Sequence, residues 1–493
     1  MTGDRRALGI LALAALGILG ALPGLRTPDL GFCYPFMTPD SWDWLANGLY
    51  WAGAPLLPSF RPPGLPLLVA LLSHFSALPL LPFLNYAALG LSAALLYRLV
   101  RLRQDALVSA LAVLLFVSNG SLFGHVRYVM AEVYTLPFLV GAAIAFEKAA
   151  LRPRLYVACG LLLSVSFLFH YAGLVAGLGF GLALALFRTP ALRTGSCGSA
   201  PSALRTRWPW IALFVAVPLP VAWLAFRALQ YRAHPEAGIH VIEGLVRLSA
   251  GNLRYYGVVA IALCGLLPLP LYLAGFRRLV RRHAEPWSHA VLGPLLALGL
   301  FFTFLYDWKD KRFLYYLFPF AVCVAAEGIA SLREWGRESR GRSFATVAFL
   351  VLALLWNRIP YPRDTGSLVA FSPYDFLDAA MGLRTATWKT LPVQEDGFLS
   401  FRSAPQGCRY EGERLAVPYV KRALDERLAP GEPVALDFAA ARPEHYWAAT
   451  NRLAIALGRR VGLQNGERAL LRIEPDGSLR AFLDGRPLAV PGP

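Results

Sequence analysis

The first 357 residues are a series of apolar runs separated by short, arginine-rich loops. Backbone polar groups find no water inside a membrane, so runs of this kind cross it as α-helices of roughly 20 residues. We expect an α-helical polytopic membrane protein with eleven spans, several of them short. The predicted spans are Leu8–Leu25, Leu80–Val100, Ala106–Ser118, Val129–Phe146, Leu155–Phe169, Ala172–Phe187, Trp210–Leu229, Tyr256–Phe276, Ser288–Tyr306, Phe313–Leu332 and Phe344–Trp356.

The distribution of charge argues against a nucleic-acid-binding protein. The chain carries a formal charge of +17, but its excess of Lys and Arg lies in the loops of residues 1–357, whereas residues 358–493 hold 18 basic and 16 acidic residues. Basic loops between apolar runs are typical of the positive-inside rule and of contact with anionic lipids. No nucleic-acid motif accompanies them. We therefore expect membrane lipid, and no nucleic acid, as a partner.

The positive-inside rule also sets the topology. Leu8–Leu25 could be the apolar core of a signal peptide, but no convincing cleavage site follows it, so we interpret it as the first span, with a cytoplasmic N-terminus. Gly64–Leu78 is interpreted as a helix on the outer surface, because counting it as a span would invert every later loop. This assignment puts 20 of the 30 basic residues of 1–357 inside a bacterial-type inner membrane and the C-terminus outside.

Residues 358–493 differ from the rest in their patterning, and we place a domain boundary after residue 357. Helix-like and strand-like spacings alternate there and predict a small extracytoplasmic α+β domain. The last two strands flank a Pro-Asp-Gly turn, which predicts a hairpin. No catalytic motif is recognisable, so a lid or a partner surface is the favoured role. The predicted elements are helices Tyr419–Leu428 and Glu444–Leu457 and strands Val434–Phe438, Leu470–Ile473 and Leu479–Leu483.

Six cysteines show neither the spacing of a zinc site nor a disulfide framework. Cys33 and Cys408 are the two that the topology places outside, in an oxidising compartment, and a bridge between them is one interpretation. A shared compartment does not by itself supply the geometry of a disulfide, so two free thiols are the favoured interpretation.

The outer loop after the first span, Phe32 to Pro66, carries the leading candidates for chemistry. Asp40 and Asp43 are three residues apart, which places both carboxylates near one face of a helix. Aromatic and leucine residues up to Gly53 favour a helix that lies in the membrane interface. Arg61-Pro62-Pro63-Gly64 then forces an extended connection. The alternative is an ordinary solvated helix start, where the macrodipole favours an acidic residue.

A cluster of cations precedes the tenth span, in DWKDKRFLYYLFP. Basic side chains beside aromatic ones, on the side where charge is otherwise sparse, suit a phosphate or pyrophosphate. A single cation there would more simply be a snorkelling anchor. The candidate binding residues are Lys309, Lys311, Arg312, Tyr315 and Tyr316.

Glu132 is a further candidate, because a carboxylate at the outer end of a span is costly without a partner. Arg127 and His125 precede it in HVRYVMAEVYTLPF, and a structural Glu132–Arg127 pair is an equally good interpretation. His170 falls at the tight outer turn between two spans. A lone His in such a turn is more often a cap or a packing group than an acid or base.

In their order and sidedness these motifs resemble the GT-C membrane glycosyltransferases. The shared features are a first span, TPDSWDWLANGL, FRPPGLPLL, MAEVYTLP near a span end, and DKRFLYYLFPFAV before a late span. The resemblance is strongest to the protein O-mannosyltransferases and the lipid A aminoarabinose transferase, and it covers roughly residues 1–357. It implies a GT-C fold and the transfer of a sugar from a polyprenyl-phosphate donor to a lipid, glycan or protein at the outer face of the membrane.

The resemblance also implies roles for individual residues. Asp40 is similar in position to the essential Asp that acts as general base on the acceptor, and Asp43 is the second choice. Arg61 belongs to the segment that shapes the cleft. The motif of Arg312 would hold the donor phosphate. The first loop has no Asp-Glu pair of the mannosyltransferase kind, which argues against a protein acceptor.

Some relatives use a divalent metal such as Mg²⁺ or Mn²⁺, but no ligand cluster in this sequence requires one. A transporter or flippase of a lipid-linked or anionic substrate is the alternative function, and it predicts midplane charges and two related halves. A non-catalytic scaffold protein is a third hypothesis, and it predicts that Asp40 can be substituted without loss of function.

Overall fold

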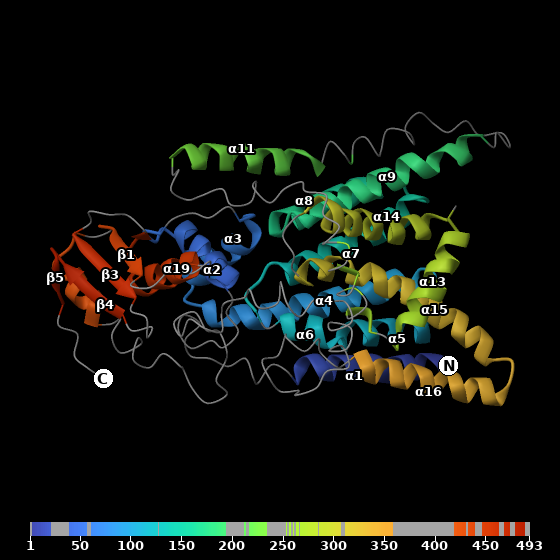
Figure 1. The fold of residues 1–493 in the computed structure, drawn as a ribbon. Coiled ribbons are helices and arrows are strands. Elements are labelled where there is room, and N and C mark those ends of the chain that lie inside the picture. Colours follow the sequence, from blue (N-terminus) through green and yellow to red (C-terminus); the bar gives the residue numbers. More distant parts are fainter. Residues whose placement is uncertain are drawn as a thin grey trace.

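The computed structural model describes residues 2–20, 39–56, 61–126, 128–193, 212, 216–233, 253, 256–257, 260, 263–265, 267–283, 285–306, 311–357, 419–429, 432–438, 446–462, 468–473 and 479–488. Figure 1 shows a bundle of long helices at one side, a small sheet at the other, and short helices between them. The chain is therefore predominantly helical, with an α+β region formed by its C-terminal part.

The bundle contains a helix in or beside each predicted span. Most of these helices run side by side in Figure 1 and share one apolar core. They are α1 (Thr2–Leu19), α4 (Leu81–Arg101), α5 (Ala106–Val117), α7 (Glu132–Ala149), α8 (Leu155–Phe169), α9 (Ala172–Arg193), α11 (Pro218–Ala233), α13 (Leu269–Arg281), α14 (Pro286–Leu300), α15 (Phe318–Gly336) and α16 (Arg340–Asn357). A short helix, α6 (Gly120–His125), links α5 to α7.

Two helices are long and apolar enough on their own to cross a membrane, within the described residues: the continuous segments Leu78–Arg101 and Pro286–Leu305. The second segment ends in a π-helical turn, Phe301–Leu305. The remaining helices of the bundle are shorter or carry more charge. The eleven-span count is therefore not established by helix length alone.

The predicted span Tyr256–Phe276 is interrupted: the described backbone is helical at 256–257, 260 and 263–264, and a second helix, α13, follows after a break. Gly265 has a φ of +82° and Pro268 caps the helix that follows, so α13 begins only at Leu269 and continues to Arg281. Proline is well suited to the first turn of a helix, where its missing N–H costs nothing. The result is an amphipathic helix: Leu271, Gly275 and Leu279 are buried, and basic residues occupy its last turn.

Helices α13 and α15 approach each other with backbone against backbone. A Cβ atom added to Gly275 would lie 1.8 Å from the carbonyl oxygen of Val324, and one added to Gly328 would lie 2.0 Å from that of Leu271. The two helices can pack at this distance only because both positions are glycine.

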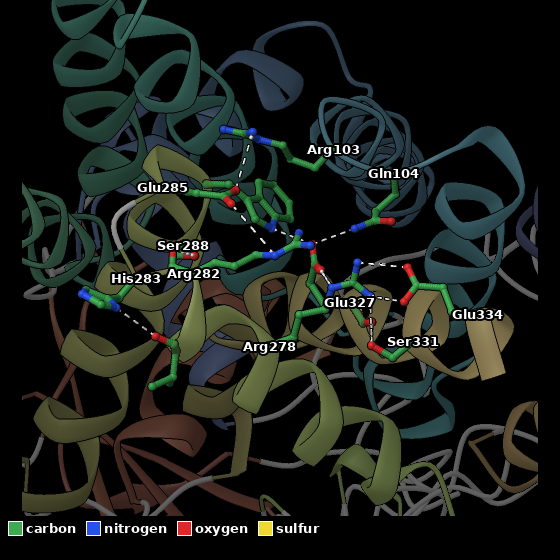
Figure 2. A network of polar contacts seen from close by, with 12 residues as sticks. Arg103, Gln104, Arg278, Arg282, His283, Glu285, Ser288, Glu327, Ser331 and Glu334 are labelled. Atoms are coloured by element: carbon green, nitrogen blue, oxygen red, sulfur yellow. Dashed lines mark hydrogen bonds and ion pairs between the residues drawn. The ribbon is translucent and has the colours of Figure 1, made fainter.

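Polar side chains join several helices at the end of the bundle that the charge pattern places inside (Figure 2). The fully buried Glu327 of α15 accepts from Trp287 Nε1 at 2.9 Å and from Gln104 Nε2 at 2.7 Å, and Arg278 Nε lies 3.2 Å from its other oxygen. Arg103 pairs with Glu147 of α7 at 2.7 Å. A buried carboxylate needs such partners, and here they fix α13, α14 and α15 on the loop after α4.

Two short helices lie over the other end of the bundle. Helix α2 (Pro39–Trp51) is the helix that the sequence predicts to carry Asp40 and Asp43, and α3 (Gly64–His74) lies within the predicted surface helix Gly64–Leu78. They pack closely, since a Cβ on Gly48 would lie 2.4 Å from the side chain of Val69. Pro62 and Pro63 are buried and lead into α3.

The C-terminal region forms a five-stranded mixed sheet in the order β2-β1-β3-β4-β5, flanked by α19 (Tyr446–Leu457). Strands β1 and β3 are parallel, and β3 and β4 are antiparallel with Ala469 opposite Leu483, which confirms the predicted hairpin pairing. Helical backbone over 419–425 agrees with the first predicted helix, and the outermost strands were not predicted because each has only two residues. The strands are β1 (Val434–Phe438), β2 (Val461–Gly462), β3 (Ala469–Ile473), β4 (Leu479–Leu483) and β5 (Arg486–Pro487).

We expect the Gly328→Ala variant to lose stability, because the added methyl group meets the backbone of α13 and overpacking of this kind costs about 1–3 kcal/mol. Thermal unfolding of the detergent-solubilised protein checks this. Gly90→Ala on α4 is the matched control, since no atom lies within 4 Å of a Cβ at that position. Equal melting temperatures for the two variants would contradict the close approach.

Candidate active site

The two carboxylates of α2 share one guanidinium group. Arg61 Nη2 donates to Asp40 Oδ1, and Arg61 Nε donates to Asp43 Oδ2. The i, i+3 spacing places both acidic side chains on one face of α2, where Arg61 reaches both. The Arg61 guanidinium also lies 5.0 Å from the ring centroid of the buried Trp44, so it is held between its ion pairs and an aromatic face.

A second arginine reaches the same carboxylate from far along the chain. Arg312 Nη1 donates to Asp40 Oδ2, so both oxygens of Asp40 bind guanidinium groups. Arg312 belongs to a 3₁₀ helix, Lys311–Tyr316, directly before α15. Its Nε lies 3.7 Å from Glu132 Oε1 at the start of α7, and His125 Nε2 lies 3.5 Å from the other Glu132 oxygen. The structure thus joins α2 and the segment before α3, the start of α7 and the segment before α15.

The guanidinium groups control the ionisation of Asp40. Burial by itself would raise the pKa of Asp40, but Arg312 and Arg61 outweigh it and hold this pKa well below its usual value. Burial would lower the pKa of Arg61, and the two carboxylates raise it instead. Asp40 and Arg61 are therefore both charged at neutral pH, and Asp40 has little affinity for a proton while both arginines hold it.

Tyr315 and Tyr316, both expected near a bound phosphate, are fully buried. The ring of Tyr315 lies 4.7 Å from that of His125, and the ring of Tyr316 stacks on His170 at 4.6 Å. These rings support the backbone that carries Arg312. His170 ends α8, and its Nδ1 accepts from the N–H of Ala172 at 3.1 Å, which is the capping role that its turn position suggests.

Several candidate residues fall outside this description. Arg127 and Lys309 lie outside the described residues, as do Cys33 and Cys408, and for Lys311 only the backbone is described. The sequence suggests Arg127 as a partner of Glu132; in the structure, His125 and Arg312 face Glu132.

One residue of the site was not predicted from the sequence. Asn451 of α19 donates from Nδ2 to Asp43 Oδ1 at 3.3 Å. It lies 408 residues from Asp43 in a domain without a recognisable motif, so no local pattern could have indicated it.

A divalent metal does not fit this arrangement. Both oxygens of Asp40 face arginines, Asp43 faces Arg61 and Asn451, and Glu132 faces Arg312 and His125. Within the described part of the chain, no three acidic, His or Cys side chains converge as metal ligands. A cation bound here would have to displace guanidinium groups that already balance the carboxylates.

Comparison with known proteins identifies the fold. No protein-family model and no curated protein matches the sequence. Among solved structures, ArnT from Cupriavidus metallidurans is similar with a TM-score of 0.57 in its apo state and 0.55 bound to undecaprenyl phosphate, at 14% identity, over 95% of this chain and 87% and 92% of the two ArnT chains.

The oligosaccharyltransferase of Archaeoglobus fulgidus, tethered to an acceptor peptide, is similar with a TM-score of 0.52 and 14% identity over 93% of this chain. This chain spans 64% of the length of that enzyme. These likenesses show that the chain shares its fold with these membrane enzymes, one of which belongs to the families that the sequence motifs resemble.

We expect the stability of the protein to fall as pH decreases from about 6.5 to about 4, in part because of His170. Burial lowers the pKa of His170 from 6.5 to about 4, so in this range the unfolded state binds more protons than the folded state. Thermal unfolding of detergent-solubilised protein across this range measures the slope. The His170→Asn variant retains an acceptor for the Ala172 N–H but cannot be protonated, and its slope should be shallower.

The control is His74→Asn, because His74 is exposed at the end of α3. This variant should keep the wild-type slope. If His170→Asn also keeps it, the folded state does not hold His170 neutral.

Proposed function

We propose that the protein is a membrane glycosyltransferase that moves a sugar from a polyprenyl-phosphate donor to a lipid, glycan or protein acceptor at the outer face of a bacterial-type inner membrane. The observation that carries the proposal is the cluster of Asp40, Arg61 and Arg312. A base for an acceptor and positive charge for a departing phosphate are the two requirements of this reaction.

The donor class is supported by the arginines and by the fold. Guanidinium groups bind phosphate oxygens in a planar, two-pronged geometry that a lysine does not offer. ArnT, which shares the fold, binds undecaprenyl phosphate, and the oligosaccharyltransferase binds an acceptor peptide. We assign the donor phosphate to Arg61 and Arg312, and the side chain of Lys311 would add charge beside them.

The reaction we propose is a direct displacement. The acceptor oxygen attacks the anomeric carbon, the bond from that carbon to the phosphate oxygen breaks, and the acceptor proton passes to Asp40 while the leaving phosphate takes the negative charge. Attack from the face opposite the phosphate inverts the anomeric centre. The attraction between the departing phosphate and the positive charges of Arg61 and Arg312 is then strongest in the transition state, which lowers the barrier.

Donor binding would also raise the affinity of Asp40 for a proton, which is low in the free enzyme. A phosphate that binds Arg61 and Arg312 competes with Asp40 for the same N–H groups, and a carboxylate that loses these partners regains its affinity for a proton. Asp40 is then a weak base in the free enzyme and a stronger one in the donor complex. Asp43 keeps Arg61 in place through Nε, which leaves the Nη groups of Arg61 for the phosphate.

The proposal includes the topology. Eleven spans would place α2 and α3 at the outer surface, the N-terminus in the cytoplasm, and residues 358–493 outside as a separate domain. The polar network around Glu327 then lies at the cytoplasmic end, away from the site. The outer position of α2 would bring Asp40 to the level of the lipid headgroups, where the sugar of a lipid-linked donor lies.

We expect Asp40→Asn to reduce sugar transfer by about 10²–10⁴-fold, because the amide cannot accept the proton of the acceptor. Asp43→Asn should retain more activity, since its proposed role is to hold Arg61. The assay uses membranes with equal amounts of each protein and radiolabelled polyprenyl-phosphate sugars. Asp484→Asn, which changes an exposed carboxylate paired with the exposed Arg468 in the C-terminal domain, is the matched control.

Full activity of Asp40→Asn would show that another group takes the proton. If wild-type membranes transfer sugar from none of the donors, the transferase proposal is wrong and a transporter becomes the better hypothesis.

Transfer should also be insensitive to chelators. The arginines around Asp40 supply the positive charge that a divalent ion would otherwise provide at the departing phosphate. Activity of wild-type membranes measured with and without excess EDTA checks this. A loss that added Mg²⁺ or Mn²⁺ restores would mean that the arginines give way to a metal when the donor binds.

A further inference from the structure

Helix α2 lies between two apolar cores. Trp42 and Leu45 belong to the core of the bundle, whereas Ala46 belongs to the core of the C-terminal domain. A helix buried on both sides is positioned by both partners. The location of Asp40 and Asp43 therefore depends on the C-terminal domain as well as on the bundle.

Helix α19 is the part of the C-terminal domain that packs on α2 (Figure 1). Leu453 and Leu457 of α19 are buried in the core of their own domain. Ile455 contacts both cores, and Asn451 lies one turn before it, so these two residues share the stripe of α19 that faces α2.

The Asn451 amide meets a carboxylate that already has one partner. Arg61 Nε binds Asp43 Oδ2, and Asn451 Nδ2 lies 3.3 Å from Asp43 Oδ1. Two donors from different segments fix the plane of the carboxylate, which one donor alone does not. An amide does this without adding a charge that would compete with Arg61 or with an incoming phosphate.

We propose that Asn451 is a positioning residue of the active site, through which the C-terminal domain holds Asp43 and thereby Arg61. This inference rests on the glycosyltransferase function proposed above. It gives the C-terminal domain a defined part in catalysis. Asn451 acts through Asp43 and does not touch the reacting atoms.

The test is a double-mutant cycle between Asn451 and Asp43, with kcat and KM of sugar transfer measured for each variant. Asn451→Ala should lower kcat by about 3–30-fold with less effect on the KM of the acceptor, because the catalytic groups are misaligned. In the Asp43→Asn background the same change should have an effect below twofold, since the carboxylate it acts on is already absent.

A charge exchange provides the rescue. Asn451→Asp puts a second carboxylate beside Asp43 and should lower kcat more than Asn451→Ala does. Combining it with Asp43→Asn restores one amide and one carboxylate at the contact, with donor and acceptor exchanged, and should recover part of the loss. A residue that served only to stabilise the domain would show no such recovery.

Arg468→Ala is the control for the domain, because Arg468 is exposed beside the sheet and pairs with Asp484. It should leave kcat unchanged. Thermal unfolding of each variant verifies that the C-terminal domain remains folded.

The outcomes separate this inference from the proposed function. If wild type transfers sugar and Asn451→Ala stays within twofold of it, or if the two losses multiply in the double variant, the inference is wrong and the function stands. If wild type transfers nothing, the proposed function is wrong, and the same double-mutant cycle is then measured on melting temperature. Additive shifts would overturn the Asn451–Asp43 contact. Coupled shifts would show a contact that is structural alone.

Discussion

The ion pairs of Arg61 and Arg312 with Asp40 are the interaction on which the rest of the site depends. These side chains bring three segments that are distant in sequence together at one point. Removing charges from water is costly, and the cost is recovered only where geometry and further hydrogen bonds are good. Here Trp44, Glu132 and Asp43 supply the additional contacts. Loss of any one charge would leave the others incompletely balanced.

Local patterns in the sequence were sufficient to predict most helices and strands, but they could not predict the contacts between distant residues. The spacing of Asp40 and Asp43 indicated a shared helix face, and alternation together with the turn sequence indicated β1, β3 and β4, because these features depend on neighbouring residues. The sharing of Arg61 between both carboxylates could not be predicted, since it requires the path of the buried prolines. Neither could the contacts of Asp40 with Arg312 or of Asp43 with Asn451, which span 272 and 408 residues.

The buried network around Glu327 was missed for a related reason. A single Glu in the apolar pattern of α15 resembles any residue near the end of a span, and its partners come from three other segments. The break within the predicted span Tyr256–Phe276 was missed because the apolar run continues through Gly265 and Pro268 without a change in hydrophobicity. The backbone conformation at Gly265 interrupts the helix, and hydrophobicity does not report conformation.

The contacts just before α15 and at its middle limit how the molecule can move. Arg312, just before α15, is tied to α2, and Glu327, within it, is tied to the loop after α4 and to α13 and α14. Sliding α15 by one turn would break both sets of contacts and push Gly328 past a backbone carbonyl. We therefore expect α15 to keep its position relative to its neighbours, unlike the helices of alternating-access carriers, which rock against one another. If the proposed function holds, we expect the site to open to a bulky acceptor by movement of α2 and of the C-terminal region packed on it, and not of α15.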